Sequence, residues 1–274
     1  MNINKTKYIL RSLLLQGFWN SRKMQNVGML FTMYPYLCQL YSSGSAKFFK
    51  RAIQRNLETF NTNPAMVSFC LGAVMKQEKV LLDTQSNMNT FYDQEKEWFI
   101  IRSSVSTTVA SLGDRLFWST IKPLSLVLAF TVLYLGQVYF FNDVVTTSNM
   151  ELPIIIALTL ASLGYNIPVF VTRYKGFTLS YEGNEENFFG LTKLNWNKVI
   201  TVLKTAGQVL TVFLFIYGLY FYFYDSVIDV NVITRVSLLS AFIILSVFIK
   251  KWNIPNIYLY LGSVLVFTLV ALFL

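Results

Sequence analysis

The sequence predicts an all-α, multi-pass membrane protein, with broken or re-entrant helices in the N-terminal half and about four to five hydrophobic helices after it. Hydrophobic residues make up 54% and charged residues 14% of the 274 residues, whereas about a quarter of an average soluble domain is charged. Several stretches without a charged residue have the length of a membrane-spanning helix. The fold class therefore follows from composition and from these stretches together.

The net charge of +9 does not indicate a nucleic-acid-binding protein. Lys122, the neighbours Arg173 and Lys175, and the pair Lys250 and Lys251 all adjoin apolar runs. This placement follows the positive-inside rule of membrane proteins. No recognised nucleic-acid motif accompanies the charge, and we expect no nucleic acid partner.

Two charge-free segments in the front third, residues 24–46 and 59–75, differ from ordinary spanning helices. Pro35 interrupts the first and Pro64 the second, and both contain several amide and hydroxyl side chains. In hydrocarbon an unsatisfied polar or backbone group costs several kcal/mol, so such segments belong inside protein or along a watery cavity. We expect broken helices here, with a substrate path beside them.

Between these segments, residues 47–58 predict a basic amphipathic helix. Phe49, Ile53 and Leu57 recur at four-residue spacing, while basic residues such as Arg55 lie elsewhere around the helix. We expect this helix to lie at the cytoplasmic interface of the membrane.

The rest of the chain predicts hydrophobic helices. The uncharged stretches long enough to span a bilayer are residues 123–141, 152–172, 205–224 and 252–274. The shorter stretch 236–249, between Arg235 and Lys250, is consistent with a partial span, a helix buried among others, or half of a hairpin. The polar segments 83–97 and 181–198 are expected to be connections outside the membrane.

The chain contains no histidine, which excludes several kinds of chemistry. It can form no Ser-His-Asp or Cys-His pair, no imidazole metal site and no phosphohistidine. No P-loop pattern occurs, which argues against ATP-driven transport by this chain alone. The two cysteines, Cys38 and Cys70, lie in apolar settings and are expected to be small core residues without a disulfide. We expect neither a metal site nor a cofactor.

Three amides in the opening block of the chain are candidates for contact with a sugar. Gln16, Asn20 and Gln25 can each donate to and accept from hydroxyl groups. They avoid the desolvation cost of a charged side chain. The structural alternative is that these amides bridge helices or satisfy broken backbone.

A helix break is predicted near Pro64. Proline disfavours helix at the residue before it, which places Asn61 and Thr62 beside the break. Backbone groups exposed at such a break can coordinate a substrate. The structural alternative is that Asn61 and Thr62 cap the next helix.

Asp114 precedes a long apolar segment, and an ionisable group entering a membrane helix is a functional-site candidate. Its neighbour Arg115 cannot share a helix face with it. Arg115 is therefore expected to face either lipid headgroups or another subunit.

Four blocks of the sequence together resemble the IID membrane component of the mannose/fructose/sorbose type of sugar phosphotransferase system. Residues 10–28 resemble the family's LxxSxxLQxxWNxxRMQxxG opening, and residues 55–64 its RHLEFFNTxP box. Residues 71–78 resemble the LGxxxxxEE segment, and residues 112–123 the GxGDxxFWxTxxP box. A weaker likeness lies at residues 173–176, which resemble an RYxG-type segment.

The resemblance implies a single membrane domain over residues 1–274, with a motif-bearing region at 8–123 and mainly transmembrane helices at 124–274. It implies a permease subunit and not an enzyme, in which this chain and a IIC subunit form the path for a hexose-type sugar. IIA and IIB proteins would carry the phosphoryl group, and IIC–IID heterodimers would form a trimer in the bacterial cytoplasmic (inner) membrane. The candidate substrate-binding residues are Gln16, Asn20, Gln25, Asn61, Thr62, Glu78 and Asp114.

Four positions depart from the family pattern. Asn56 replaces a histidine, Thr59 a phenylalanine and Lys79 the second glutamate, while Arg115 stands where the family has a small residue or proline. Glu78 matches the first glutamate, so Lys79 removes a paired carboxylate. These departures motivate an alternative, a diverged IID-like scaffold or sensory partner that does not transport.

Overall fold

The computed structural model describes residues 4–42, 46–140 and 151–225. Within these residues the chain forms helices and connections but no strand, which confirms the all-α fold. The chain divides into two compact units, Met1–Val212 and Phe213–Leu274, and the sites described below lie in the first. The predicted helical stretches 236–249 and 252–274 lie outside the described residues.

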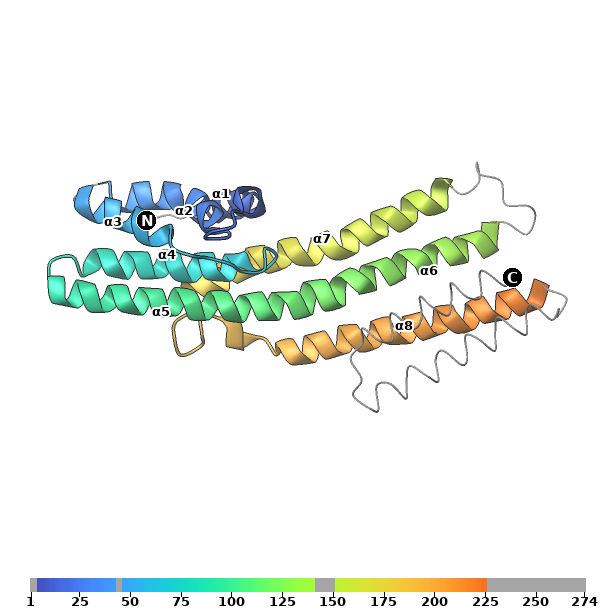
Figure 1. The fold of residues 1–274 in the computed structure, drawn as a ribbon. Coiled ribbons are helices and arrows are strands. Elements are labelled where there is room, and N and C mark those ends of the chain that lie inside the picture. The colour runs from blue at the N-terminus through green and yellow to red at the C-terminus, as the bar shows by residue number, and fades with distance from the viewer. Residues whose placement is uncertain (1–3, 43–45, 141–150, 226–274) are drawn as a thin grey trace. The chain divides into compact units, whose positions relative to one another are not determined.

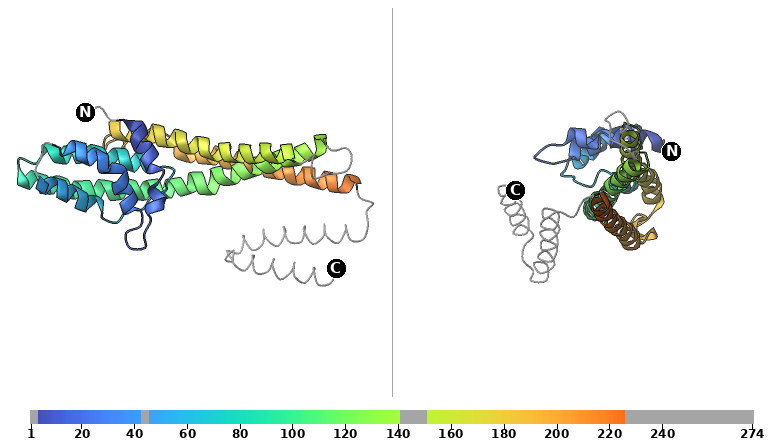
Figure 2. Two further views of the ribbon diagram at one scale, coloured as in Figure 1. Left: turned by 90° about the horizontal axis from the view of Figure 1, so that it is seen from above. Right: turned by 90° about the vertical axis from the view of Figure 1, so that its right-hand side faces the viewer.

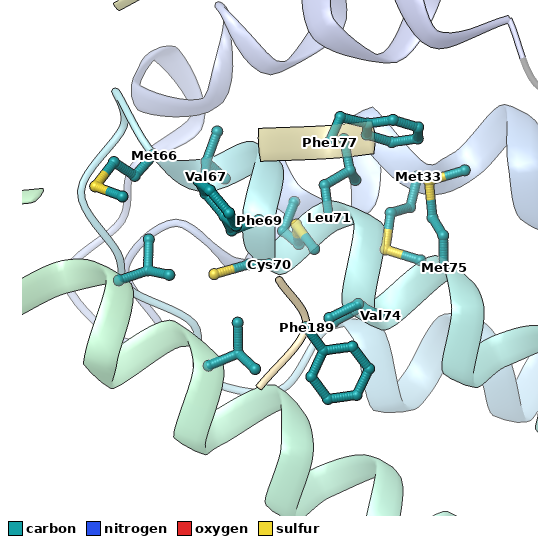
Figure 3. Close-up of a cluster of buried hydrophobic side chains, with 14 of the residues drawn as sticks. Met33, Met66, Val67, Phe69, Cys70, Leu71, Val74, Met75, Phe177 and Phe189 are labelled. Carbon is teal, nitrogen blue, oxygen red and sulfur yellow. The ribbon is translucent and has the colours of Figure 1, made fainter. Parts of the chain in front are cut away.

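The front of the chain forms a compact bundle of short and long helices (Figure 1). Its elements are α1 (Lys5–Ser12), η1 (Leu15–Phe18), α2 (Asn26–Leu40), α3 (Ala46–Asn56), α4 (Val67–Asp83) and α5 (Met88–Gly113). The buried side chains of α4 are central to the core. Figure 3 shows them against Met33 of α2, Phe177 and Phe189.

The break expected at Pro35 is wrong, because α2 continues through this residue. Proline lacks the N–H that would bond to the carbonyl four residues earlier, which here belongs to Phe31. The guanidinium of Arg11 donates to this carbonyl instead, from Nε at 3.1 Å and Nη2 at 2.6 Å. The break expected before Pro64 is confirmed, since residues 57–66 form a non-helical connection between α3 and α4.

The predicted amphipathic helix forms as α3, but part of its basic surface is buried. Phe49 and Ile53 pack against the core. Arg55 lies away from the apolar stripe, as expected, but it is only 3% exposed. The reason is an ion pair with Glu78 of α4, described below.

The polar segment 83–97 is mostly helix and not a connection. Asn87 caps the N-terminus of α5, because its Oδ1 accepts from the backbone N–H of Asn89 at 3.1 Å. The segment 181–198 does contain a connection, which includes η4 (Leu191–Lys193). The cysteine prediction holds for Cys70, which is buried, but not for Cys38, which is exposed on α2.

Among the described residues, three helices are long and apolar enough to cross a membrane, namely Met88–Leu135, Glu151–Glu182 and Trp196–Gly218. In the first, α5 passes through the π-helical segment η2 (Asp114–Ile121) into α6 (Lys122–Phe140). The second is α7 (Glu151–Glu182), and the third lies in α8 (Trp196–Asp225). Figures 1 and 2 show α6 and α7 side by side.

The first of these helices is too long to lie wholly in a bilayer. Its 48 residues extend over about 72 Å at about 1.5 Å per residue, whereas the hydrocarbon core is about 30 Å thick. Its last charged residue is Lys122, and the part that begins at Pro123 carries no charge, as a segment within the hydrocarbon core requires.

Two glycines let α4 and α7 approach closely. A Cβ at Gly72 would lie 2.8 Å from both the Phe177 carbonyl oxygen and the Tyr181 nitrogen, and one at Gly176 would lie 2.7 Å from the Phe69 ring. Both atoms that oppose Gly72 belong to the backbone of α7. Only a residue without a Cβ fits there without moving the helix.

We expect Gly72→Ala to lower the free energy of unfolding by about 1–3 kcal/mol, because α7 must shift away from the added methyl group. Thermal unfolding of the purified full chain in detergent measures the change. Gly17→Ala is the matched control, since no atom lies within 4 Å of its added Cβ. Equal shifts in the two variants would contradict this account of the crossing.

Candidate functional site

The connection between α3 and α4, residues 57–66, is held from one side by Gln25. Gln25 is 2% exposed, and its Oε1 accepts from the Thr62 backbone N–H at 2.9 Å. Its Nε2 donates to the Thr62 carbonyl at 3.0 Å and to Gln16 Oε1 at 3.1 Å. One side-chain amide thereby satisfies both backbone groups of Thr62, in place of a strand partner.

Asn20 holds the turn before Gln25 and supports the start of the same connection. Its Nδ2 donates to Asn26 Oδ1 at 2.8 Å, and its Oδ1 accepts from the Lys23 backbone N–H at 2.8 Å. Asn26 in turn donates to the Leu57 carbonyl at 2.7 Å. The predicted residues Gln16, Asn20, Gln25 and Thr62 therefore belong to one continuous hydrogen-bonded group.

Asn63 holds the connection from the opposite side. Its Nδ2 donates to Asp114 Oδ1 at 2.8 Å, and its Oδ1 accepts from the Ala65 backbone N–H at 3.0 Å. The side chain lies directly against Gly113, where an added Cβ would collide with it. The sequence prediction missed Asn63, although an asparagine directly before a proline is typical of a turn that its own side chain stabilises.

Arg102 of α5 is a second residue that the sequence prediction missed. It is 5% exposed, and it donates to the carbonyls of Thr59 at 3.1 Å and Glu58 at 3.0 Å. These carbonyls lie just after the end of α3, so no backbone N–H of a following helical turn donates to them. The sequence did contain a signal for this residue, because Arg102 is an isolated arginine among the apolar and hydroxyl residues of the second half of α5.

Glu78 belongs to a separate, buried ion network. The Arg55 guanidinium donates to both carboxylate oxygens, from Nε to Oε1 at 2.9 Å and from Nη2 to Oε2. Asn56 donates to Oε1 at 2.8 Å, and the Tyr41 hydroxyl lies 3.2 Å from Oε2. The carboxylate thus has several donors and no free face toward the connection.

The electrostatics of this network keep the arginine charged and the phenol neutral. Burial lowers the pKa of Arg55, but the adjacent Glu78 carboxylate raises it, and the net pKa lies above the ordinary value. Burial also raises the pKa of Tyr41, and the negative charge of Glu78 raises it further. At neutral pH we expect the charged Arg55 and the protonated Tyr41 to persist.

A second carboxylate does stand beside the network, although Lys79 replaces the expected one. Glu95 of α5 accepts from Arg51 Nε at 2.8 Å and lies 3.4 Å from Arg55 Nη1. Lys79 is exposed on the outer surface of α4. The buried network therefore has its second carboxylate from Glu95, and the residue at position 79 does not change that number.

The seven predicted site residues fall into two groups. Six lie on or around residues 57–66, and of these Gln16, Asn61 and Asp114 are exposed while Gln25 and Thr62 are buried. The seventh, Glu78, is fully buried in the ion network. The exposed group presents mainly neutral amides on a fixed backbone, which suits a polyhydroxylated ligand.

No nucleophile of this region is activated. Burial raises the pKa of the Cys70 thiol to about 12, despite its contact with Thr62. The thiol is therefore protonated at neutral pH. The arrangement offers hydrogen bonds to a ligand, and its buried thiol is not activated for nucleophilic attack.

Comparison with known families matches residues 2–268 to the PTS system mannose/fructose/sorbose family IID component. The PTS system mannose-specific EIID component of Escherichia coli (strain K12) is 34% identical over 114 residues, 42% of this chain and 38% of that protein. The fructose permease IID component of Bacillus subtilis (strain 168) is 28% identical over 114 residues, again 42% and 38% of the two chains. The aligned part is therefore less than half the length of these relatives.

Two solved structures share the fold over nearly the whole chain. One is described as the structure of a membrane protein, with a TM-score of 0.63 and 21% identity over 96% of this chain and 93% of the other. The second is a cryo-EM structure of the mannose transporter ManYZ in complex with microcin E492 (MceA), with a TM-score of 0.52 and 20% identity over 97% and 95% of the chains. At these identities the likeness concerns the fold.

Proposed function

We propose that this chain, which belongs to the mannose/fructose/sorbose family of PTS IID components, forms a sugar permease together with a IIC subunit in the bacterial cytoplasmic membrane. The observation that carries the proposal is the fixed connection 57–66, where the exposed amide of Asn61 stands on a backbone held by Gln25 at Thr62 and by Asp114 at Asn63. Apolar helices long enough to cross a membrane adjoin it.

Within this proposal the candidate residues have different roles. Asn61, Gln16 and Asp114 are exposed and would contact the sugar hydroxyls. Gln25 and Thr62 are positioning residues, since their polar groups bond to each other. A sugar binds well to groups that both donate and accept and that cost little to desolvate, as amides do.

The chain would not carry out phosphoryl transfer itself. It has no histidine, and its buried cysteine is protonated. IIA and IIB proteins would supply the phosphoryl group, and the IIC subunit would complete the path for a hexose. A trimer of IIC–IID heterodimers is the assembly that the family membership suggests.

The departures from the family pattern give little support to a non-transporting scaffold. Asn56 keeps a hydrogen bond to Glu78, so the histidine it replaces is not needed to satisfy this carboxylate. Thr59 and Lys79 are exposed and take no part in the fixed geometry of Thr62 and Asn63. None of these substitutions removes an exposed amide from the connection.

We expect Asn61→Ala to weaken sugar uptake by about 2- to 12-fold, because one lost hydrogen bond to a sugar hydroxyl costs about 0.5–1.5 kcal/mol. The apparent affinity for hexoses, measured on the complex with IIC, IIA and IIB proteins, checks the prediction. Asn184→Ala is the matched control, since Asn184 is an exposed asparagine of another connection. Equal uptake by both variants and the unmodified chain would contradict a sugar contact at Asn61.

A further inference from the structure

Two cations face each other across a cleft between η2 and α8, away from residues 57–66. The cleft has a volume of about 450 Å³ and is lined by Arg115 and Ser119 of η2 and by Lys204 of α8. Arg115 Nη2 donates to Asn197 Oδ1 at 3.3 Å, which keeps the guanidinium beside α8. Within the described part of the chain neither cation forms an ion pair. The cleft therefore presents two uncompensated positive charges.

The π-helical form of η2 places the polar groups of this cleft on one face. The hydroxyl of Thr120 donates to the Arg115 carbonyl five residues earlier, at 2.8 Å. In a π-helix, residues four and five apart share a face, so Arg115, Ser119 and Thr120 all point toward α8. Such wide turns are frequent at functional sites.

The polar cleft continues into an apolar groove between α6 and α8. The groove has a volume of about 600 Å³ and shares Thr120 and Lys204 with the cleft. Its walls are Leu124 and Val127 of α6 and the surface around Gly207 of α8. At Gly207 the nearest neighbour of an added Cβ would be Leu124 Cδ1, at 3.5 Å. The groove therefore accepts a methyl group at this position, whereas a larger side chain would fill it.

The cleft lies at the boundary of the hydrocarbon region. Lys122 and Lys204 are the last charged residues before the uncharged stretches 123–135 of α6 and 205–212 of α8. The groove follows these uncharged stretches, whereas the cleft lies on their basic side. By the positive-inside rule the basic side is cytoplasmic.

We propose that the cleft and groove together bind one anionic phospholipid of the cytoplasmic leaflet. The phosphate would lie between Arg115 and Lys204, with the hydroxyl of Ser119 as a further donor. One acyl chain would occupy the groove along Leu124. Basic pockets between membrane helices are suited to such headgroups, and a soluble phosphate compound would leave the adjoining groove unused.

The test is native mass spectrometry of the full chain, purified with any partner that copurifies and titrated with phosphatidylglycerol or phosphatidylcholine of the same acyl chains. We expect preferential binding of phosphatidylglycerol. The double variant Arg115→Gln/Lys204→Gln should reduce this binding by about 30-fold, which corresponds to about 1 kcal/mol for each cation. Both side chains are exposed, so thermal unfolding should not change.

Two controls separate this site from general attraction to basic surfaces. Lys198→Gln also removes one positive charge from α8. Lys198 lies six residues before Lys204 and about a third of a turn away around the helix, so this variant should leave binding unchanged. Gly207→Leu fills the groove without a change of charge. It should weaken the binding of long-chain phosphatidylglycerol, whereas Gly207→Ala should not.

Three results would overturn the proposal. The first is equal binding of the two lipids, and the second is an equal effect of Lys198→Gln and the double variant. The third is displacement of phosphatidylglycerol by inorganic phosphate at the same concentration, which would assign the cleft to a soluble phosphate compound.

Discussion

Arg55→Met is expected to lower the free energy of unfolding by about 3–5 kcal/mol, because it leaves the Glu78 carboxylate buried without its cation. Glu78 is 0% exposed, so water cannot replace the lost partner. Asn56 and Tyr41 would remain beside it, but neither carries a positive charge. Thermal or denaturant unfolding of the purified complex in detergent measures the loss.

Two further variants make this prediction specific. Arg51→Met removes an arginine from the edge of the same network and should cost less, because the Arg51 side chain is 32% exposed and Glu95 still contacts Arg55. The double variant Arg55→Met/Glu78→Met removes both charges and should recover much of the stability. If Arg51→Met and Arg55→Met were equally destabilising, burial of the pair would not be the cause.

Gln25→Ala is expected to reduce uptake by at least about 30-fold while the chain still inserts into the membrane. The variant leaves the buried N–H and C=O of Thr62 without a partner, at about 1–3 kcal/mol for each group. The connection 57–66 would then adopt other conformations, and the exposed Asn61 would lose its fixed position. Uptake by the assembled complex measures the functional effect.

Hydrogen exchange at the Thr62 amide separates positioning from direct sugar contact. If Gln25 acts by holding the connection, exchange at this amide should accelerate in Gln25→Ala even without sugar. Gln39→Ala is the control, since Gln39 is an exposed glutamine of the neighbouring helix α2. Unchanged exchange together with lost uptake would assign Gln25 to the sugar instead.

The hydrophobic pattern was sufficient to predict the helical fold and the apolar helices that begin near Pro123 and Leu152. The helix predicted to begin at Thr205 begins nine residues earlier, at Trp196. The pattern was not sufficient at Pro35. The helix persists there because Arg11, a residue distant in sequence, satisfies the freed carbonyl of Phe31. Local rules for proline cannot anticipate a donor that arrives from another helix.

The candidate site was predictable only in part, because contacts between distant residues also decide its geometry. Residue type identified the amides near the break at Pro64, but it could not separate Gln25, whose amide is fully used inside the protein, from the exposed Asn61. Arg55 was expected on an interfacial helix and Glu78 in a substrate site, whereas the two form a buried pair. Which residues pair depends on how α3 and α4 pack, and the one-dimensional pattern does not contain that information.

Sugar transport by this chain together with a IIC subunit is the central proposal. Its most direct measurement is phosphorylation-coupled uptake of several hexoses by the reconstituted IIC, IIA and IIB proteins, with and without this chain. We predict uptake of at least one hexose that requires the chain and decreases with Asn61→Ala but not with Asn184→Ala. Absence of coupled uptake of every hexose by the complete, folded complex would contradict the account.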